Sequence, residues 1–325
     1  MQRRLASMGA LRLIGCLVLL LVLVGISGCG GGAGDAYAIE VYTRADACGA
    51  ADTWALFLDG HKQEELGGTG INSDPGIAQA VIQDKRGIGF NNIGYAYDMD
   101  SGLQVSGLRV VPIDVDENGR IDDWEEFYGT KHEVATAIAE GLYPSPPARD
   151  LYFVAKGGFS GPAKAFVRWV LTDGQQFVDE AGYVRLPDAK IADALAKLGE
   201  AQDSLTGTIT ITGAFALYPM TVQWAEEFRK LHPAVKIDIS AGGAGKGMTD
   251  ALNGLADIGM ISRQIYPSEE ASGAFWVPVT KDAVVAVVNA DNPVLEELLE
   301  TGMTRQDFID IWINATLTDW REVTG

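Results

Sequence analysis

Two strand–turn–helix units in the second half of the chain constrain the fold most strongly. In the first, a β-type run at residues 208–212 ends at Gly213, and a helical pattern follows at residues 219–231. In the second, a β-type run at residues 235–239 ends in a glycine-rich turn at residues 241–247, before another helical pattern. Parallel strands built this way direct two helix N-termini at one edge of a sheet, where free N–H groups and partial positive charge attract anions. The two units therefore predict an anion-binding edge.

Strand-like and helix-like stretches alternate after residue 38, which favours an α/β fold with mainly parallel sheets. The expected strands lie at residues 38–43, 87–90, 108–113, 151–155, 208–212, 235–239, 258–261 and 283–289. The expected helices lie at residues 51–58, 74–83, 160–171, 189–198, 219–231, 247–253 and 305–313. A chain of 325 residues with 47% hydrophobic residues can form one large core or two modest ones, and we expect two lobes.

The composition excludes several classes of protein. A formal net charge of −19 and the lack of any Lys/Arg-rich run argue against a nucleic-acid-binding surface. The three histidines, His61, His132 and His232, lie in unrelated contexts, which argues against a histidine metal centre or a histidine-based hydrolase triad. Cys48 has no motif histidine beside it. We therefore expect that the chain is not an enzyme.

The N-terminus has the pattern of an export signal. Arg3 and Arg4 precede an apolar run at residues 13–24, and small residues then lead to Cys29. This ending resembles a bacterial lipobox, so we expect a signal peptide at residues 1–28 and a lipidated Cys29. Residues 29–37 would form a Gly-rich tether that holds an exported protein at the membrane surface. The alternatives are a plain signal peptide and an uncleaved anchor.

Residues 114–125 match the calcium-loop pattern D-x-[DN]-x-[DN]-G-x₅-E at every position. The six predicted metal ligands, with Arg120 contributing its carbonyl oxygen, are Asp114, Asp116, Asn118, Arg120, Asp122 and Glu125. A strand precedes the loop, and a helix-like stretch at residues 124–141 follows it. We expect this EF-hand-like loop to bind a structural Ca²⁺, and the alternative is an acidic surface turn.

The second half of the chain resembles the beginning of the phosphate-transport substrate-binding proteins, which have the type 2 periplasmic-binding-protein fold. The similar segments are residues 211–219, 224–228, 242–247, 256–263 and 284–289. Residues 39–58 resemble the mid-chain Arg-x-Asp-x-Ser-Gly-Thr segment of that family, and residues 87–90, 143–152 and 174–184 follow in family order. The resemblance covers nearly all of the chain with its halves exchanged, which implies a circularly permuted chain.

The permuted order implies a particular division into lobes. Lobe two would be discontinuous and would combine residues 38–95 with residues 292–325. Lobe one would be continuous over residues 98–288 and would include the calcium loop. The crossings between them would fall near residues 91–92 and 289–290.

The resemblance also implies that an oxyanion lies between the lobes, held by hydroxyls, helix-terminal N–H groups and an arginine. The matching positions in this chain are Ala214, Phe215, Ala244, Gly245, Ser262, Arg263, Arg44, Cys48, Gly49 and Ala50. Arg44 is retained, with Asp46 placed to orient it. Five hydroxyl positions of the family are replaced, by Ala214, Phe215, Ala244, Cys48 and Ala50. Each lost hydrogen bond to a charged acceptor weakens anion binding by about 1.5–3 kcal/mol.

We therefore expect a lipid-anchored, extracytoplasmic substrate-binding protein of a phosphate-type ABC transporter. Its partners would be phosphate or another small anion, the transporter permease, and the membrane through its lipid. An alternative is a surface sensor or adhesion lipoprotein with a degenerate pocket, and a further alternative is that the alanines only pack the lobes and no ligand binds. A P-loop at residues 240–247 is excluded, because Ser240 replaces the first glycine and Gly247 replaces the final hydroxyl residue.

Overall fold

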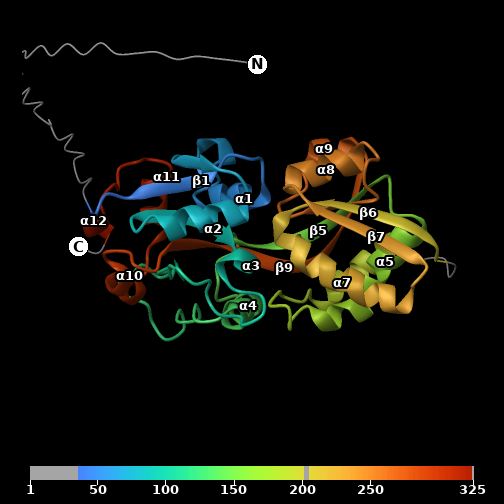
Figure 1. Cartoon of the computed structure of the whole chain (residues 1–325), viewed down its shortest axis with the longest axis horizontal. Helices are drawn as coiled ribbons and strands as arrows, with labels where there is room; N and C mark the ends of the chain where they lie inside the picture. The colour runs from blue at the N-terminus through green and yellow to red at the C-terminus, as the bar shows by residue number, and fades with distance from the viewer. Residues whose placement is uncertain (1–35, 201–204, 324–325) are drawn as a thin grey trace, which may run out of the picture. The chain divides into compact units, whose positions relative to one another are not determined.

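Strands and helices alternate along residues 36–200 and 205–323, which are the residues described by this computed structural model (Figure 1). The strands are β1 (Glu40–Arg44), β2 (Thr69–Ile71), β3 (Gly87–Asn92), β4 (Leu108–Val110), β5 (Ala148–Lys156), β6 (Gly207–Gly213), β7 (Val235–Ala241), β8 (Ile258–Ile261) and β9 (Ala274–Asn289). The helices are α1 (Gly49–Phe57), α2 (Asp74–Gln83), α3 (Ile93–Ala96), α4 (Lys131–Glu140), α5 (Gly161–Leu171), α6 (Asp188–Leu198), α7 (Tyr218–Leu231), α8 (Ala244–Leu252), α9 (Pro267–Ala271), α10 (Leu295–Thr301), α11 (Arg305–Trp312) and α12 (Trp320–Val323). The predicted signal peptide at residues 1–28 and the predicted lipidation site at Cys29 lie outside the described residues.

The strands pair in the order β2-β1-β3-β9-β5-β8-β6-β7, and β4 also pairs with β9. β1 is parallel to β2 and β3, and β6 is parallel to β7 and β8. β9 runs antiparallel to β3, β4 and β5, and β5 runs antiparallel to β8. The α/β class is therefore confirmed, but the expectation of mainly parallel sheets is wrong, because β9 at the centre of the sheet runs antiparallel to β3, β4 and β5, and β5 runs antiparallel to β8.

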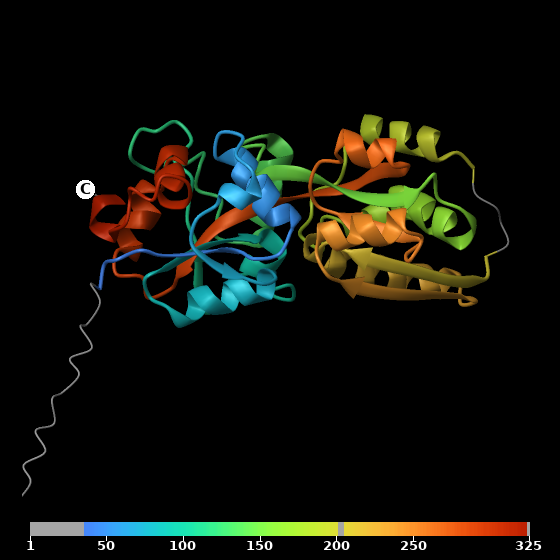
Figure 2. The same cartoon turned by 90° about the horizontal axis from the view of Figure 1, so that it is seen from above.

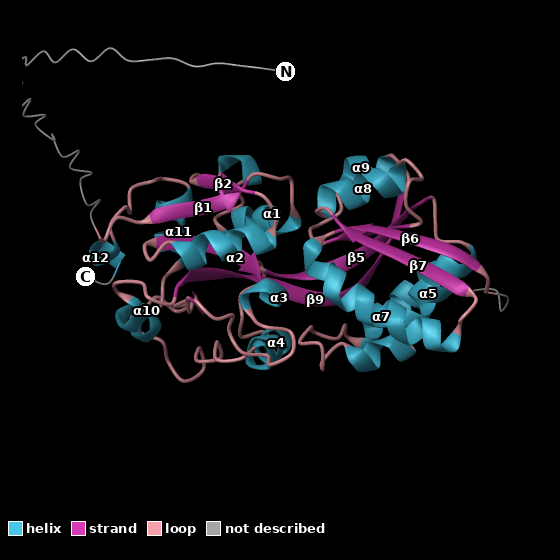
Figure 3. Cartoon of the chain, in the orientation of Figure 1, coloured by secondary structure: helices cyan, strands magenta, loops and turns pink. Residues whose placement is uncertain are grey.

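Two hydrophobic cores form along this sheet. The first core is built from buried residues at 48–148 and 283–320, with Val184, and the second core from buried residues at 151–279. β5 and β9 contribute to both cores and lie side by side (Figure 2). In the second core, α7 and α8 lie on opposite sides of β6 and β7 (Figure 3). The cores divide the chain differently from the predicted lobes, because the buried residues at 108–148 pack in the first core.

Local capping explains where several helices begin. α2 starts after Ser73, whose hydroxyl accepts a hydrogen bond from the N–H of Gly76, and Pro75 occupies its first turn. α4 starts at a capping box formed by Thr130 and Glu133, and it ends at Gly141 in a left-handed conformation. The helix expected from residue 124 therefore starts later, at the residue that the capping box defines.

The two ends of the described chain lie together. Ala38 and Asp319 form an antiparallel bridge, in which the N–H of Ile39 donates to the carbonyl oxygen of Thr318 at 2.8 Å. The N–H of Trp320 also donates to the carbonyl oxygen of Tyr37 at 2.8 Å. Within residues 36–200 and 205–323, no helix is both long and apolar enough to cross a membrane.

Candidate anion-binding site

The predicted site residues from the two halves of the chain meet where the cores adjoin. Gly49, the first residue of α1, lies so close to Ser262 that a Cβ on Gly49 would overlap its hydroxyl and its backbone. A Cβ on Gly245, in the first turn of α8, would lie 3.4 Å from the carbonyl oxygen of Ala47. A Cβ on Gly243 would lie 3.5 Å from Asp46 Oδ2. The structure therefore brings the first turns of α1 and α8 to one place, together with Ser262.

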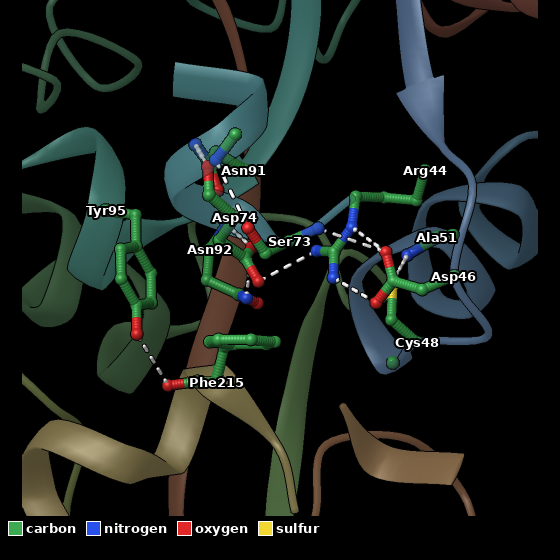
Figure 4. A network of polar contacts seen from close by, with 12 residues as sticks. Arg44, Asp46, Cys48, Ala51, Ser73, Asp74, Asn91, Asn92, Tyr95 and Phe215 are labelled. Atoms are coloured by element: carbon green, nitrogen blue, oxygen red, sulfur yellow. Dashed lines mark hydrogen bonds and ion pairs between the residues drawn. The ribbon is translucent and has the colours of Figure 1, made fainter. Parts of the chain in front are cut away.

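Arg44, at the end of β1, lies in the same place and is fully enclosed (Figure 4). Its Nε and Nη2 atoms donate to the two carboxylate oxygens of Asp46 at 2.9 and 2.7 Å, and its Nη1 donates to Asp74 Oδ2 at 2.8 Å. Burial alone would lower the pKa of Arg44, but Asp74 and Asp46 outweigh burial and raise this pKa above its ordinary value. Arg44 is therefore a permanent cation that two carboxylates already neutralise.

Asp74 is a site residue that the sequence analysis did not identify. It is buried in the first turn of α2, and its Oδ1 accepts hydrogen bonds from the backbone N–H of Asn92 at 3.3 Å and from Asn92 Nδ2 at 2.5 Å. The N–H of Ser73 donates to Asp46 Oδ1 at 3.1 Å. The N-terminus of α2, which attracts negative charge, therefore holds both carboxylates against Arg44.

Arg149 is a second residue that the sequence analysis did not identify. It connects β5 and β9, the two strands shared by both cores, to α1 in the first core. It lies on β5 and forms an ion pair with Asp282 on β9, with 2.9 Å between Nε and Oδ1. It also donates to the carbonyl oxygen of Gly49 at 2.5 Å, to Thr53 Oγ1 at 3.0 Å and to Asn92 Oδ1. Burial raises the pKa of Asp282, and the charge of Arg149 offsets only part of that shift.

The turn after β6, at Ala214 and Phe215, offers fewer free hydrogen-bond donors than the sequence analysis suggested. The N–H of Ala214 already donates to the carbonyl oxygen of Met260 at 2.8 Å, so it is not free for a ligand. The ring of Phe215 lies 6.0 Å from the guanidinium carbon of Arg44, and its carbonyl oxygen accepts a hydrogen bond from Tyr95 at 3.3 Å. Phe215 therefore places an aromatic surface, rather than a hydroxyl, beside the arginine.

Cys48 and Ala50 belong to the start of α1. Cys48 is the N-cap, and its sulfur accepts a hydrogen bond from the N–H of Ala51 at 3.4 Å, while its own N–H donates to Gln63 Oε1 at 3.1 Å. Burial raises the pKa of the Cys48 thiol to about 12, so the thiol stays protonated and is a poor nucleophile. Ala50 is buried. Its methyl group stands at a position where the family that the chain resembles has a hydroxyl side chain.

Arg263 is engaged by its own segment. It forms two hydrogen bonds with the carboxylate of Glu269, at 3.0 and 2.6 Å, and its guanidinium carbon lies 4.2 Å from the ring centroid of Tyr266. The hydroxyl of Tyr266 donates to Asp52 Oδ1 on α1 at 2.7 Å. Arg263 therefore supports a contact between the cores, and its charge is balanced by Glu269.

A cavity of about 750 Å³ opens beside these contacts. Both cores line it, with Ala47, Cys48, Asp52, Gly245, Arg263 and Tyr266 among its walls. Its size is in the range of small-molecule sites, which often lie where two parts of a protein adjoin. A solute that reaches the first turn of α8 would enter by this cavity.

The predicted calcium loop brings carboxylates together. One oxygen from each of Asp114, Asp116 and Glu125 lies within 4.8 Å of the others. The two oxygens of Asp114 accept hydrogen bonds from the N–H groups of Asn118 at 3.2 Å and Gly119 at 2.8 Å. The side chains of Asn118 and Asp122 are hydrogen-bonded to each other at 2.7 Å, and Arg120 is exposed. Oxygen ligands in this arrangement suit Ca²⁺.

The chain is similar in sequence to known binding proteins. Residues 198–325 match the family model described as the PBP superfamily domain. The chain is 26% identical to "Phosphate-binding protein PstS 2" of Streptococcus agalactiae over 258 residues, which cover 79% of this chain and 74% of the relative. It is 24% identical to the protein of the same name from Streptococcus pneumoniae, over 88% of this chain and 87% of the relative. The chain is therefore similar, over most of its length, to proteins named as phosphate-binding proteins.

The fold of the chain agrees with a solved structure. The crystal structure of a phosphate ABC transporter, phosphate-binding protein from Streptococcus pneumoniae matches with a TM-score of 0.57 and 21% identity. The match covers 88% of this chain and 99% of that chain. The relatives are named as binding proteins rather than as enzymes, which confirms the prediction that the chain is not an enzyme. None of these matches assigns a role to individual residues, so the predicted ligand contacts stay predictions.

Proposed function

We propose that this protein is an extracytoplasmic substrate-binding protein of a phosphate-type ABC transporter. It binds phosphate or another small anion where the two cores adjoin. One observation carries the proposal: Arg44, the first turns of α1 and α8, and Ser262 come together from distant parts of the chain. The names of the relatives, which are phosphate-binding proteins, support the same ligand class.

The proposed mechanism of anion binding follows from the positive charge of Arg44 and the helix N-termini, and from Gly49, which lets the two cores approach each other. Helix N-terminal N–H groups and an arginine supply hydrogen-bond donors to an oxyanion, and closure about β5 and β9 brings the two sets together. Gly49 allows backbone to approach backbone across the boundary, because a Cβ there would overlap Ser262, whereas a Cβ on Gly245 would make only an ordinary contact with Ala47. The replaced hydroxyls, at Ala214, Ala244 and Ala50, favour weaker binding of bare phosphate than an all-hydroxyl site.

The proposal predicts that phosphate raises the melting temperature of the full chain and that Arg44→Ala removes this effect. A ligand that binds the folded state stabilises it in proportion to the logarithm of its concentration over Kd. Thermal-shift and calorimetric titrations with phosphate, sulfate, tungstate and a phosphonate provide the measurement. Arg305→Ala is the matched control, because Arg305 is half exposed and paired with Asp59. If no anion shifts the melting temperature of the wild-type chain, anion binding is ruled out.

We propose in addition that the chain order is permuted relative to the usual order of the family that it resembles. The PstS 2 relatives, which match over most of both chains, would share this permuted order. The match to the PBP superfamily domain starts at residue 198, in the second half of the chain, which supports an exchanged order. The bridge between Ala38 and Asp319 also supports it, because chain ends that lie together can be joined while the chain is cut elsewhere.

Export and anchoring complete the proposal. Residues 1–28 would direct export, and lipid on Cys29 would hold the folded part at the membrane through the tether at residues 29–37. The partner would be the permease of an ABC transporter, which receives the anion from the closed protein. The relative named as a protein of a phosphate ABC transporter supports this partner.

The second candidate is a surface sensor or adhesion lipoprotein with a degenerate pocket. The neutralisation of Arg44 by two carboxylates favours it, because a ligand-binding arginine usually keeps donors free. The anion titrations separate the two functions. An adjacent gene for a transporter permease would favour transport.

We also propose that residues 114–125 bind a structural Ca²⁺. Asp114 and Glu125 are almost completely buried, and the loop backbone already folds around the oxygens of Asp114. The metal would offset the repulsion among the carboxylates and join β4 to the segment that leads into α4.

Chelation of calcium is therefore expected to lower the melting temperature of the wild-type chain, and added Ca²⁺ should restore it. Glu125→Gln should remove this response, because it takes away the carboxylate at the last loop position. Glu126→Gln is the matched control, since Glu126 is exposed and lies outside the ligand pattern. Differential scanning fluorimetry with and without chelator measures both variants. An unchanged melting temperature of the wild-type chain after chelation would contradict a calcium site.

A further inference from the structure

We propose that Asp74 is an internal competitor of the ligand for Arg44, an inference that rests on the proposed function. In the arrangement seen here, the carboxylate of Asp74 holds the edge of the guanidinium that a bound anion would use. Ligand binding then requires that the anion displaces Asp74 from Arg44 Nη1. Asp74 thereby limits the affinity of the site for small anions.

The contacts of Arg44 leave little of its guanidinium for a ligand. Asp46 takes Nε and Nη2 in a paired geometry, and Asp74 takes Nη1 (Figure 4). The side chain of Arg44 has no exposed surface, and Phe215 lies on one side of it. One positive and two negative charges therefore stand in a buried place, and an added anion would meet net repulsion unless one carboxylate leaves.

Asp46 and Asp74 differ in how they are held. Asp46 is close to Arg44 in sequence and binds it through both oxygens, which is the strong geometry for this pair. Asp74 binds it through Oδ2 alone, while Oδ1 is held by Asn92. Asp74 is therefore the carboxylate whose single bond to Arg44 an anion can replace, while Asp46 keeps the guanidinium oriented.

The surroundings of Asp74 explain why it occupies Arg44 when no ligand is present. Asp74 lies in the first turn of α2, a ten-residue helix whose N-terminus favours negative charge. Asn91 Nδ2 also donates to its carbonyl oxygen at 3.1 Å. Ser73, just before it, has a φ of 67°, which is uncommon for a residue with a side chain.

The substitution Asp74→Asn tests the inference in the full chain. The amide oxygen can still accept from Asn92, while the amide nitrogen replaces an acceptor with a donor beside Arg44 Nη1. We expect inorganic phosphate to bind at least about tenfold more tightly than to the wild-type chain, measured by isothermal titration calorimetry. Asp84→Asn is the control, because Asp84 caps the opposite end of α2 and should leave the affinity unchanged.

Each outcome of this titration has one meaning. Equal or weaker phosphate binding by Asp74→Asn overturns the inference and leaves the proposed function intact. No binding of phosphate by either protein overturns both. Circular dichroism establishes that the variant is folded, and Asp74→Ser, which keeps a hydroxyl acceptor for Asn92, replaces it if Asp74→Asn does not fold. Tighter binding by either neutral variant supports the inference.

Discussion

Arg149→Met is expected to lower the free energy of unfolding by about 3–5 kcal/mol, the usual effect of removing one partner of a buried ion pair. Asp282 would remain buried and without its cation, and its side chain is only 1% exposed. The carbonyl of Gly49, the hydroxyl of Thr53 and the amide of Asn92 would each lose a donor. Urea unfolding followed by circular dichroism at pH 7 measures the effect.

Two further proteins test the cause of that loss. Arg149→Met combined with Asp282→Leu removes both charges and should recover part of the stability, since an apolar pair can replace a buried ion pair. Arg185→Ala is the control, because Arg185 and Asp188 are exposed and such pairs contribute about 0–1 kcal/mol. A loss below about 1 kcal/mol in Arg149→Met would contradict the structural role of this arginine.

The pH dependence of the same variant gives an independent check. A carboxyl whose pKa is raised in the folded state binds protons more strongly when folded, so its contribution is most favourable at low pH and declines as pH rises through the folded pKa. The pKa of Asp282 is raised by burial, and the charge of Arg149 lowers it in part. Without Arg149, the pKa should rise further, so the destabilisation should be larger at pH 7 than at pH 4.

Gly49→Ala is expected to weaken phosphate binding roughly 5- to 150-fold, which corresponds to the 1–3 kcal/mol typical of overpacking. The added methyl group would overlap the carbonyl group and hydroxyl of Ser262, and the backbone part of that contact cannot rotate away. The first turns of α1 and α8 would then remain too far apart to share one anion. Calorimetric titration with phosphate measures the affinity, and small-angle scattering reports whether the chain stays open.

Gly94→Ala is the matched control for this substitution. Gly94 lies in α3, and a Cβ there would make an ordinary contact, 3.6 Å from the hydroxyl of Tyr183. Both variants should therefore fold, and only Gly49→Ala should lose affinity. Equal affinities in the two variants would show that close approach of Gly49 and Ser262 is not needed for binding.

Local signals allowed much of the fold to be predicted. α2 occupies the range of residues 74–83 that was expected for it, and the paired glycine turns indicated β6, β7 and the helices after them. β9 was predicted only from residue 283, because Pro278, Lys281 and Asp282 interrupt its apolar pattern. Those residues extend as a strand because β5 pairs with them, which is a contact between distant segments. The mixture of parallel and antiparallel strands in the sheet also could not be inferred, because it too depends on pairing between distant segments.

The candidate site was predicted where a glycine or an arginine carried a local pattern. Arg44 with Asp46, Gly49 and Gly245 were identified because their segments resemble those of the phosphate-transport substrate-binding proteins. Asp74 and Arg149 could not, since their roles depend on partners 30 and 133 residues away. A charged residue inside a strand with no nearby opposite charge, such as Arg149, is the one signal that would have indicated a buried partner.

The distribution of the two cores along the chain has a consequence for the order of folding during synthesis. The second core uses only residues 151–279, whereas the first core joins residues 48–148 to residues 283–320. When the ribosome has released residue 279, the second core has every residue that it uses. The first core is then still without its central strand. Its exposed apolar surface must wait for the end of the chain, so chaperone binding during translation should concentrate on the segment made first.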